Sequence, residues 1–305
     1  VFIFGINIAG GIPAVVENAQ SLPGYLTMMT TYDPVAGVEQ PYPIINIISM
    51  IAWGLGYFGM PHILLRFMAI EDEEKLTLSR RVATIWVVIS LAVAVLIGVI
   101  GLAMSDVGAL KTLTGSDSET IIVQIADLLS KHGILPALLA GTILAGILAS
   151  TMSTADSQLL AASSAVSSDL FGDRVAKTGD KKKAMNAARF TLLAIAVIAA
   201  FIARDPNSSV LGIVSFAWAG FGAAFGPVVL FALFWRRSNR YGAIAGMLSG
   251  GAMVFIWKYL VRPLGGVWNI YELLPPFSVS CLMIVSVSLL TKAPSKEITE
   301  EFDRV

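Results

Sequence analysis

Hydroxyl-bearing side chains cluster in one apolar stretch near the middle of the chain, where residues 149–158 read ASTMSTADSQ. Ser150, Ser153 and Thr154 stand at positions i, i+3 and i+4, so a helix would place them on one face. Hard cations prefer oxygen ligands, and hydroxyls with a backbone carbonyl supply such ligands without a full charge. Small hydroxyl residues also pack membrane helices against one another. The pattern alone therefore leaves a cation site and a packing face both open.

Asp156 lies in the same stretch. A carboxylate within a membrane span costs about 2.5–3.5 kcal/mol on insertion scales and by default marks an ion or proton pathway. Asp156 follows Thr154 by two positions, about 200° around a helix, so it should not be a ligand together with Ser153 and Thr154. We predict that it faces the protein interior or a water-filled path. The structural alternatives are a place near a helix end, a hydrogen bond with Ser157, or a partner on a helix outside this sequence.

A second conspicuous stretch is residues 53–62, which read WGLGYFGMPH. Gly costs a helix about 1 kcal/mol relative to Ala, and Pro about 3 kcal/mol. A broken backbone inside a bilayer is tolerated only where protein or a water-filled cavity satisfies its polar groups. Transporters place such breaks at their substrate sites. Trp53 and Tyr57 are four positions apart and would share one helix face, so we predict a helix break beside a binding site, with a kink used only for packing as the alternative.

A third stretch, residues 217–227, reads AWAGFGAAFGP. Gly220 and Ala224 form a small-xxx-small pair, and so do Gly222 and Gly226. Such pairs allow helices to approach closely in membranes. Close packing is the main interpretation, and a flexing gate is the alternative.

The composition requires that these stretches belong to a membrane protein. Hydrophobic residues make up 56% of the 305 residues and charged residues 14%, against about 25% charged in a soluble domain. The net charge of zero gives no electrostatic reason to expect nucleic acid as a partner. The sequence contains no phosphate-binding GxxxxGK[ST] motif, no cysteine cluster and two distant histidines, so we expect neither an enzyme nor a transition-metal site. The predicted fold class is all-α, a polytopic bundle of transmembrane helices.

Apolar segments of the chain predict eight membrane spans. The run at residues 1–16 is shorter than the roughly 20 residues that a spanning helix needs, and we interpret it as the end of a helix that begins outside this sequence. The remaining predicted spans are residues 44–68, 82–104, 134–166, 184–203, 210–235, 243–261 and 275–290.

Basic residues between these spans indicate the orientation. Sixteen of the 21 Lys and Arg residues fall on one side and five on the other. By the positive-inside rule the richer side is cytoplasmic, which places the C-terminus inside and residues 17–42 outside. The five residues on the outer side are Lys111, Lys131, Arg204, Lys258 and Arg262.

Four segments of the sequence resemble the bacterial sodium/proline symporters of the sodium:solute symporter family. They are GLGYFGMPHILLRFMA at 54–69, ILASTMSTADSQLLAASSAVSSDLF at 147–171, AWAGFGAAFGPVVLF at 217–231 and LTKAP at 290–294. The resemblance implies the inverted-repeat, leucine-transporter-like fold. It implies a single transporter domain over residues 1–305 with most of the first repeat missing, so that the chain corresponds to an N-terminally truncated symporter. The implied parts are the end of a first-repeat helix at 1–16, the second five-helix repeat at 44–235, two additional helices at 241–291 and a cytoplasmic tail at 292–305.

The resemblance also implies site residues. In the family, a backbone carbonyl and two hydroxyls bind sodium at positions that match Ser150, Ser153 and Thr154. Proline recognition in the family is similar to an arrangement of Trp53, Tyr57 and Pro61. Met60 is a departure from the pattern that the resemblance implies, in which Gln is expected at this position in some relatives, and this leaves the polar contacts of the substrate open.

The implied function is sodium-coupled symport of proline by alternating access in the bacterial inner membrane. The expected partners are proline, sodium, membrane lipid and the missing N-terminal helices, which would complete both sites. One alternative is a symporter for another small solute, such as a different amino acid or a carboxylate. The other is a membrane sensor domain of a signalling protein.

Overall fold

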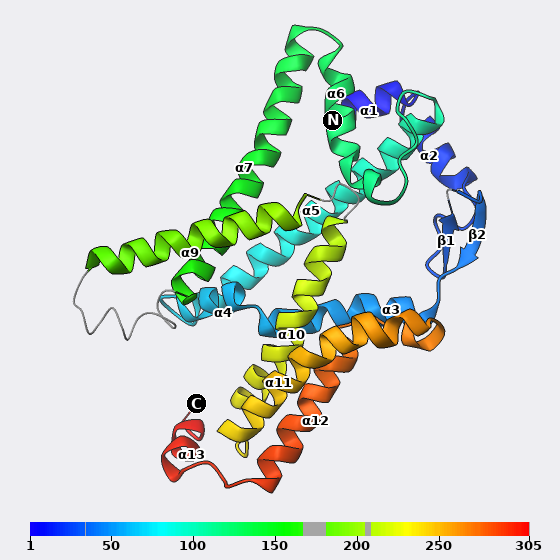
Figure 1. Ribbon diagram of the computed structural model, residues 1–305. Helices are drawn as coiled ribbons and strands as arrows, with labels where there is room; N and C mark the ends of the chain where they lie inside the picture. The colour runs from blue at the N-terminus through cyan, green and yellow to red at the C-terminus, as the bar shows by residue number, and fades with distance from the viewer. Residues whose placement is uncertain (34, 167–180, 205–208, 305) are drawn as a thin grey trace. The chain divides into compact units, whose positions relative to one another are not determined.

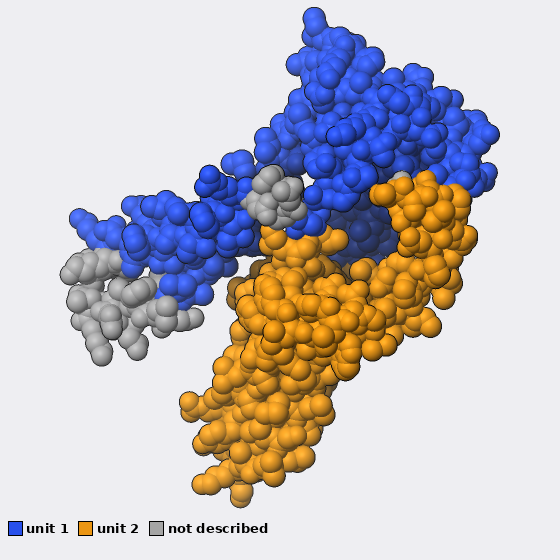
Figure 2. Space-filling model, turned by 45° about the vertical axis from the view of Figure 1, so that its right-hand side comes forward, with its two compact units in different colours: residues 1–22, 81–209 blue, residues 23–80, 210–305 orange. Residues whose placement is uncertain are grey.

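A computed structural model describes residues 1–33, 35–166, 181–204 and 209–304 of the chain. These residues form mainly helices (Figure 1). The chain divides into two compact units, which Figure 2 colours separately. Unit 1 comprises Val1–Leu22 and Arg81–Ser209, and unit 2 comprises Pro23–Arg80 and Val210–Val305.

The secondary structure in the described residues of unit 1 is helical. They are α1 (Phe2–Ile8), α2 (Ile12–Ser21), most of α5 (Lys75–Asp106), the 3-10 helix η2 (Gly115–Thr120), α6 (Ile121–Ser130), α7 (Ile134–Ala165) and α9 (Lys181–Ile202).

The core of unit 1 forms around the short helix α6. Ile125 of α6 is fully buried with Ile100 and Met104 of α5, while Leu129 of α6 packs toward Ala140 of α7. Apolar residues at spacings of three and four place one face of α6 against its neighbours. The α-helical part of this segment begins at Ile121, after the 3-10 turn η2.

Unit 2 contains a hairpin and two groups of helices. The hairpin pairs β1 (Thr30–Asp33) with β2 (Val38–Pro41) in antiparallel register. The first helical group is α3 (Ile44–Ala52), the 3-10 helix η1 (Trp53–Gly59) and α4 (Pro61–Met68). The second is α10 (Val210–Phe234), α11 (Arg240–Ile256), a π-helical turn η4 (Trp257–Val261), the 3-10 turns η5 (Arg262–Leu264) and η6 (Gly266–Trp268), α12 (Leu274–Leu290) and α13 (Lys296–Phe302).

Small residues hold α11 against α12. Gly242, Gly246 and Gly250 follow one another at intervals of four, which places them on one face of α11. The Ser280 hydroxyl of α12 donates a hydrogen bond to the Gly246 carbonyl at 2.9 Å. A Cβ atom at Gly250 would lie only 3.0 Å from Cβ of Ser280. Glycine at these positions therefore permits the close approach of the two helices.

Asn239 joins the beginning of α11 to the end of α12. Its Oδ1 accepts a hydrogen bond from the Gly242 amide at 2.8 Å, as an N-cap residue does. Its Nδ2 donates to Thr291 Oγ1 and to the Lys292 carbonyl, both at 2.8 Å. One side chain thus satisfies backbone groups that both helix ends leave unpaired.

Helices in the described residues account for the predicted spans. Five of them are long and apolar enough to cross a membrane, and two bent pairs raise the number to as many as seven. The eighth predicted span corresponds to α12, a shorter apolar helix of 17 residues. The all-α polytopic fold class is confirmed, whereas the repeat boundaries remain a prediction. The five candidate spans are Lys75–Asp106, Ile134–Ala165, Met185–Ile202, Val210–Phe234 and Arg240–Leu264.

The first apolar run differs from the single helix end predicted at residues 1–16. Helices α1 and α2 form a pair bent by 72°, and α2 continues to Ser21. Gly10 and Gly11 have φ angles of 93° and 101°, a region that favours glycine. The bend at these two glycines was not predicted, and the assignment of this run to the end of a first-repeat helix stays a prediction.

The hairpin at residues 30–41 lies within residues 17–42, the connecting segment that the sequence predicts on the outer side. Asp33 Oδ1 accepts hydrogen bonds from the amides of Val35 at 2.9 Å and Ala36 at 3.1 Å. Gln40 Nε2 donates to the other carboxylate oxygen at 2.8 Å. A single aspartate therefore stabilises the turn and its closing pair, as Asx turns do.

Some residues used in the sequence analysis lie outside the described residues. They are Arg174 and Lys177, two of the basic residues counted for the orientation, and the end of the 147–171 motif.

The glycines of α10 provide a stability test. An added Cβ at Gly226 would lie 2.9 Å from the Phe277 ring, whereas one at Gly220 meets no atom within 4 Å. We expect Gly226→Ala to cost about 1 kcal/mol relative to Gly220→Ala, because overpacking forces the ring to shift. The measurement is the thermal midpoint of the two variants in detergent. Equal midpoints would contradict the packing described here.

Candidate functional site

The predicted helix break is present between α3 and α4. Helix α3 ends at Ala52 and is followed by the 3-10 helix η1 over Trp53–Gly59. Met60 is extended, with φ −83° and ψ 112°, and Pro61 begins α4. The two arms are bent by 53°. Pro61 cannot donate the backbone hydrogen bond that a continuous helix would need, so the break follows from the local sequence.

Glycines allow η1 to pack directly on the backbone of α10. A Cβ atom at Gly59 would lie 2.8 Å from both the Gly222 Cα and the Gly226 amide nitrogen. A Cβ at Gly222 would lie 2.7 Å from the Gly56 Cα. The close packing predicted for Gly222 and Gly226 is therefore confirmed, and its partner is the broken span. The gate alternative is untested.

Four aromatic side chains gather at this break, and we call them the aromatic cluster: Trp53, Tyr57, Trp218 and Tyr271. Trp53 stacks with Trp218 at 5.4 Å between ring centroids and with Tyr271 at 5.8 Å, with interplanar angles of 15° in both pairs. Tyr57 meets Trp218 edge to face at 4.8 Å. These geometries are the favoured ones for aromatic pairs.

The indole of Trp218 also satisfies the broken backbone. Its Nε1 donates a hydrogen bond to the Trp53 carbonyl at 3.0 Å. In a bilayer a carbonyl released by a helix break must find such a donor. Helix α10 therefore contacts η1 in two ways, through the close packing of their backbones and through the hydrogen bond of this side chain.

The sequence-predicted substrate residues differ in their exposure. The Tyr57 side chain is 50% exposed, and Pro61 is exposed, whereas Trp53 is only partly so. Since Trp53 already stacks on two rings, Tyr57 has the larger free surface for a ligand. Met60 is buried, with 4% exposed.

Two members of the aromatic cluster were not predicted as site residues. Trp218 lies within the glycine-rich stretch 217–227, so the sequence gave a signal that was interpreted only as helix packing. Tyr271 lies in the loop between the η6 turn and α12, where no sequence pattern pointed to it.

The predicted cation ligands lie in unit 1, on the continuous helix α7. Ser150, Ser153 and Thr154 are all exposed. The Thr154 hydroxyl donates to the Ser150 carbonyl at 3.1 Å, which brings two candidate oxygen ligands side by side. Hydroxyl and carbonyl oxygens form a neutral donor set of the kind that suits a hard monovalent cation.

Asp156 lies on the same helix and is exposed. The neighbouring Ser157 hydroxyl donates to the Ser153 carbonyl at 2.8 Å. Among the residues that the structure describes, the Asp156 carboxylate forms no hydrogen bond or ion pair. Its predicted place on an ion path remains a prediction.

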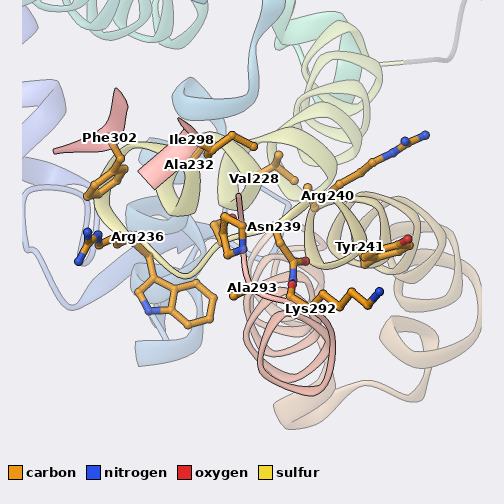
Figure 3. A pocket seen from close by; sticks show the side chains of 14 residues that line it. Val228, Ala232, Arg236, Asn239, Arg240, Tyr241, Lys292, Ala293, Ile298 and Phe302 are labelled. Atoms are coloured by element: carbon orange, nitrogen blue, oxygen red, sulfur yellow. The ribbon is translucent and has the colours of Figure 1, made fainter. Parts of the chain in front are cut away.

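A cavity of about 380 Å³ lies elsewhere in unit 2, at the ends of α10, α11 and α12 and beside α13 (Figure 3). Arg236 on its rim forms an ion pair with Asp303 at 2.6 Å. The side chains of Arg236 and Arg240 extend to opposite sides of the cavity in Figure 3, so their charges do not converge on one point. No predicted site residue lines this cavity.

Comparisons with known proteins agree on one family. The model of the sodium:solute symporter family matches residues 1–250. The high-affinity proline transporter PutP of Bacillus subtilis is 41% identical over 261 residues, 85% of this chain and 52% of that protein. The sodium/proline symporter of Salmonella typhimurium is 42% identical over 259 residues, 85% of this chain and 50% of that protein. The osmoregulated proline transporter OpuE of Bacillus subtilis is 40% identical over 253 residues, 83% of this chain and 49% of that protein.

The chain spans about half the length of these curated relatives. No solved structure matches it with statistical significance. The apolar helices agree with the comparisons in indicating a multi-pass membrane protein. Because the family model covers most of its residues, the chain belongs to the sodium:solute symporter family, which is a family of transporters.

Proposed function

We propose that this chain is the part of a bacterial sodium-coupled proline symporter that carries one side of the proline site and ligands of the sodium site. The observation that carries this proposal is the helix break at Trp53–Gly59, which presents the exposed ring of Tyr57 beside packed glycines. Three relatives that match 83–85% of the chain are named as proline transporters or symporters.

In this proposal the broken span binds proline through Tyr57, Trp53 and Pro61. Pro61 has no amide hydrogen, and the Tyr57 carbonyl accepts only a long hydrogen bond of 3.5 Å from the Met60 amide. This carbonyl therefore retains the capacity to accept a hydrogen bond from the secondary ammonium group of proline. The ring of Tyr57 would contact the apolar pyrrolidine ring.

Sodium is transported with the substrate and would bind to the Ser150 carbonyl and the hydroxyls of Ser153 and Thr154. A cation that binds one conformation more tightly than the other shifts the equilibrium between them. The sodium gradient would thereby drive alternating access around a site near the middle of the membrane. Helices outside the present sequence would complete both sites.

The charge distribution supports a multi-pass arrangement in the bacterial inner membrane with a cytoplasmic C-terminus. The lipid of that membrane would contact the apolar faces of the spans. This topology is tested by fusing a fluorescent reporter and an enzymatic reporter, each in a separate variant, after Val305. The two reporters are active on opposite sides of the membrane, so their activities show on which side the fusion point lies.

The test of function is uptake of labelled proline by the full-length protein in vesicles, with and without a sodium gradient. Uptake that requires the gradient supports the proposal. Sodium-driven uptake of another amino acid or a carboxylate, without proline uptake, would favour the alternative substrate. Absence of uptake for all of these solutes would contradict the symporter proposal and leave the sensor alternative.

Asp156 provides a separate prediction for transport. We expect Asp156→Asn to slow sodium-coupled turnover while the equilibrium affinity for proline stays within about threefold, since an amide retains most hydrogen-bonding capacity of the carboxylate. Turnover is measured as the maximal uptake rate per protein, and affinity by equilibrium binding. Equal losses of both would indicate direct binding, and wild-type turnover would indicate a structural role.

A further inference from the structure

Tyr271 is fixed by three different parts of unit 2. Its ring stacks on Trp53 of η1 at 5.8 Å. Its hydroxyl donates a hydrogen bond of 2.6 Å to the Ser215 carbonyl of α10. Its amide donates to the Ser49 hydroxyl of α3 at 3.0 Å. With 7% of its surface exposed, Tyr271 is a buried junction between α3, η1 and α10.

The loop that carries Tyr271 is itself anchored. The next residue, Glu272, is fully buried and accepts a hydrogen bond of 2.9 Å from Lys258 Nζ. Arg262 donates to the other oxygen of the same carboxylate. The indole of Trp257 donates to the Ile270 carbonyl at 3.2 Å. A buried carboxylate with two cationic partners is strongly held in place, because moving it away from both would leave its charge buried without compensation.

These contacts connect the loop between α11 and α12 to the predicted proline site. We propose that Tyr271 is a positioning residue, which fixes the ring of Trp53 and the η1 segment in the geometry that binds substrate. The proposal rests on the proposed function for its transport consequences. It extends the site to a residue beyond position 250, where the family match ends.

The physical reason is the weakness of η1 as an isolated element. A 3-10 helix with three glycines has poor hydrogen-bond geometry and high backbone freedom, so it depends on outside contacts for a single conformation. Trp218 provides one such contact, through α10. Tyr271 provides another, from the loop before α12, by stacking on the ring of Trp53.

The transport test uses Tyr271→Leu, which fills the buried space but removes the stacked ring and the hydroxyl. We expect KM for proline to rise about fivefold in the full-length protein, since an aromatic pair and one hydrogen bond are lost, while kcat changes less than KM. Tyr271→Phe retains the ring and should restore KM to within about twofold of wild type. The matched control is Tyr259→Leu, an aromatic deletion at an exposed ring that contacts Phe216 instead.

A second readout does not depend on the substrate. A cysteine introduced by Gly54→Cys has open space around it, because a Cβ there meets no atom within 4 Å. The native thiol is removed by Cys281→Ala. In this background, Tyr271→Leu should raise the rate of maleimide labelling at position 54 by about threefold, as loss of the aromatic pair loosens η1. Tyr259→Leu should leave the rate unchanged.

The two readouts separate failure of this inference from failure of the proposed function. If wild-type protein takes up no proline but Tyr271→Leu still accelerates labelling, the positioning role holds and the substrate assignment fails. If labelling and KM both stay at wild-type values in Tyr271→Leu, or change equally in Tyr259→Leu, the positioning role is refuted. If Tyr271→Leu does not accumulate, Tyr271→Met, which also lacks the ring and the hydroxyl, is labelled instead, and a rate indistinguishable from wild type overturns the proposal.

Discussion

Replacing both Ser153 and Thr154 with alanine should raise the sodium concentration for half-maximal proline uptake at least about tenfold, since each tenfold step corresponds to only 1.4 kcal/mol of lost cation binding. Both hydroxyls lie on the same face of α7, and Thr154 Oγ1 lies 3.1 Å from the Ser150 carbonyl. Removing two of three proposed oxygen ligands leaves a cation with incomplete coordination. The measurement is the sodium dependence of uptake by the full-length protein in vesicles.

The matched control for this double variant is Thr142→Ala. The Thr142 hydroxyl also lies on α7 and donates to the Leu138 carbonyl at 2.9 Å. The control therefore removes a hydroxyl from the same helix, eight positions before Ser150, the first proposed ligand. Unchanged sodium dependence in Ser153→Ala with Thr154→Ala, at normal protein levels, would refute the ligand assignment.

Tyr57→Ala should weaken proline binding by about thirtyfold or more, because truncating an aromatic hot-spot residue at a binding site costs about 2 kcal/mol or more. The affinity for sodium should change far less, since no predicted cation ligand lies on η1. Tyr57 is the most exposed ring of the aromatic cluster, at 50%. Equilibrium binding of labelled proline and of sodium to the purified protein measures both affinities.

Phe58→Ala serves as the control for this prediction. Phe58 lies beside Tyr57 in η1 and is 42% exposed, but it does not belong to the aromatic cluster. Its truncation removes similar apolar area from the same segment. Comparable losses of proline affinity in both variants would mean that η1 tolerates no truncation, and the direct contact of Tyr57 would then be unsupported.

Local sequence patterns determined the spans and the break in this protein. Apolar runs long enough to cross a membrane form helices because a backbone in lipid must satisfy its hydrogen bonds internally. Gly54, Gly56, Gly59 and Pro61 predicted the break before α4 because each acts on its own stretch of backbone. The same kind of signal was present at Gly10 and Gly11, where the prediction missed it.

The partners of the broken span were decided only by the tertiary structure. Trp218 donates to the Trp53 carbonyl across 165 positions of the chain, and no periodicity within either helix specifies that pairing. Tyr271 lies in an irregular loop, and its role depends on where the Glu272 carboxylate meets Lys258 and Arg262. Hydropathy and glycine spacing act over one or two helical turns, so they determine which segments bend and which faces are small. Which aromatic ring stacks on which depends on packing between distant segments, and only the folded chain brings those segments together.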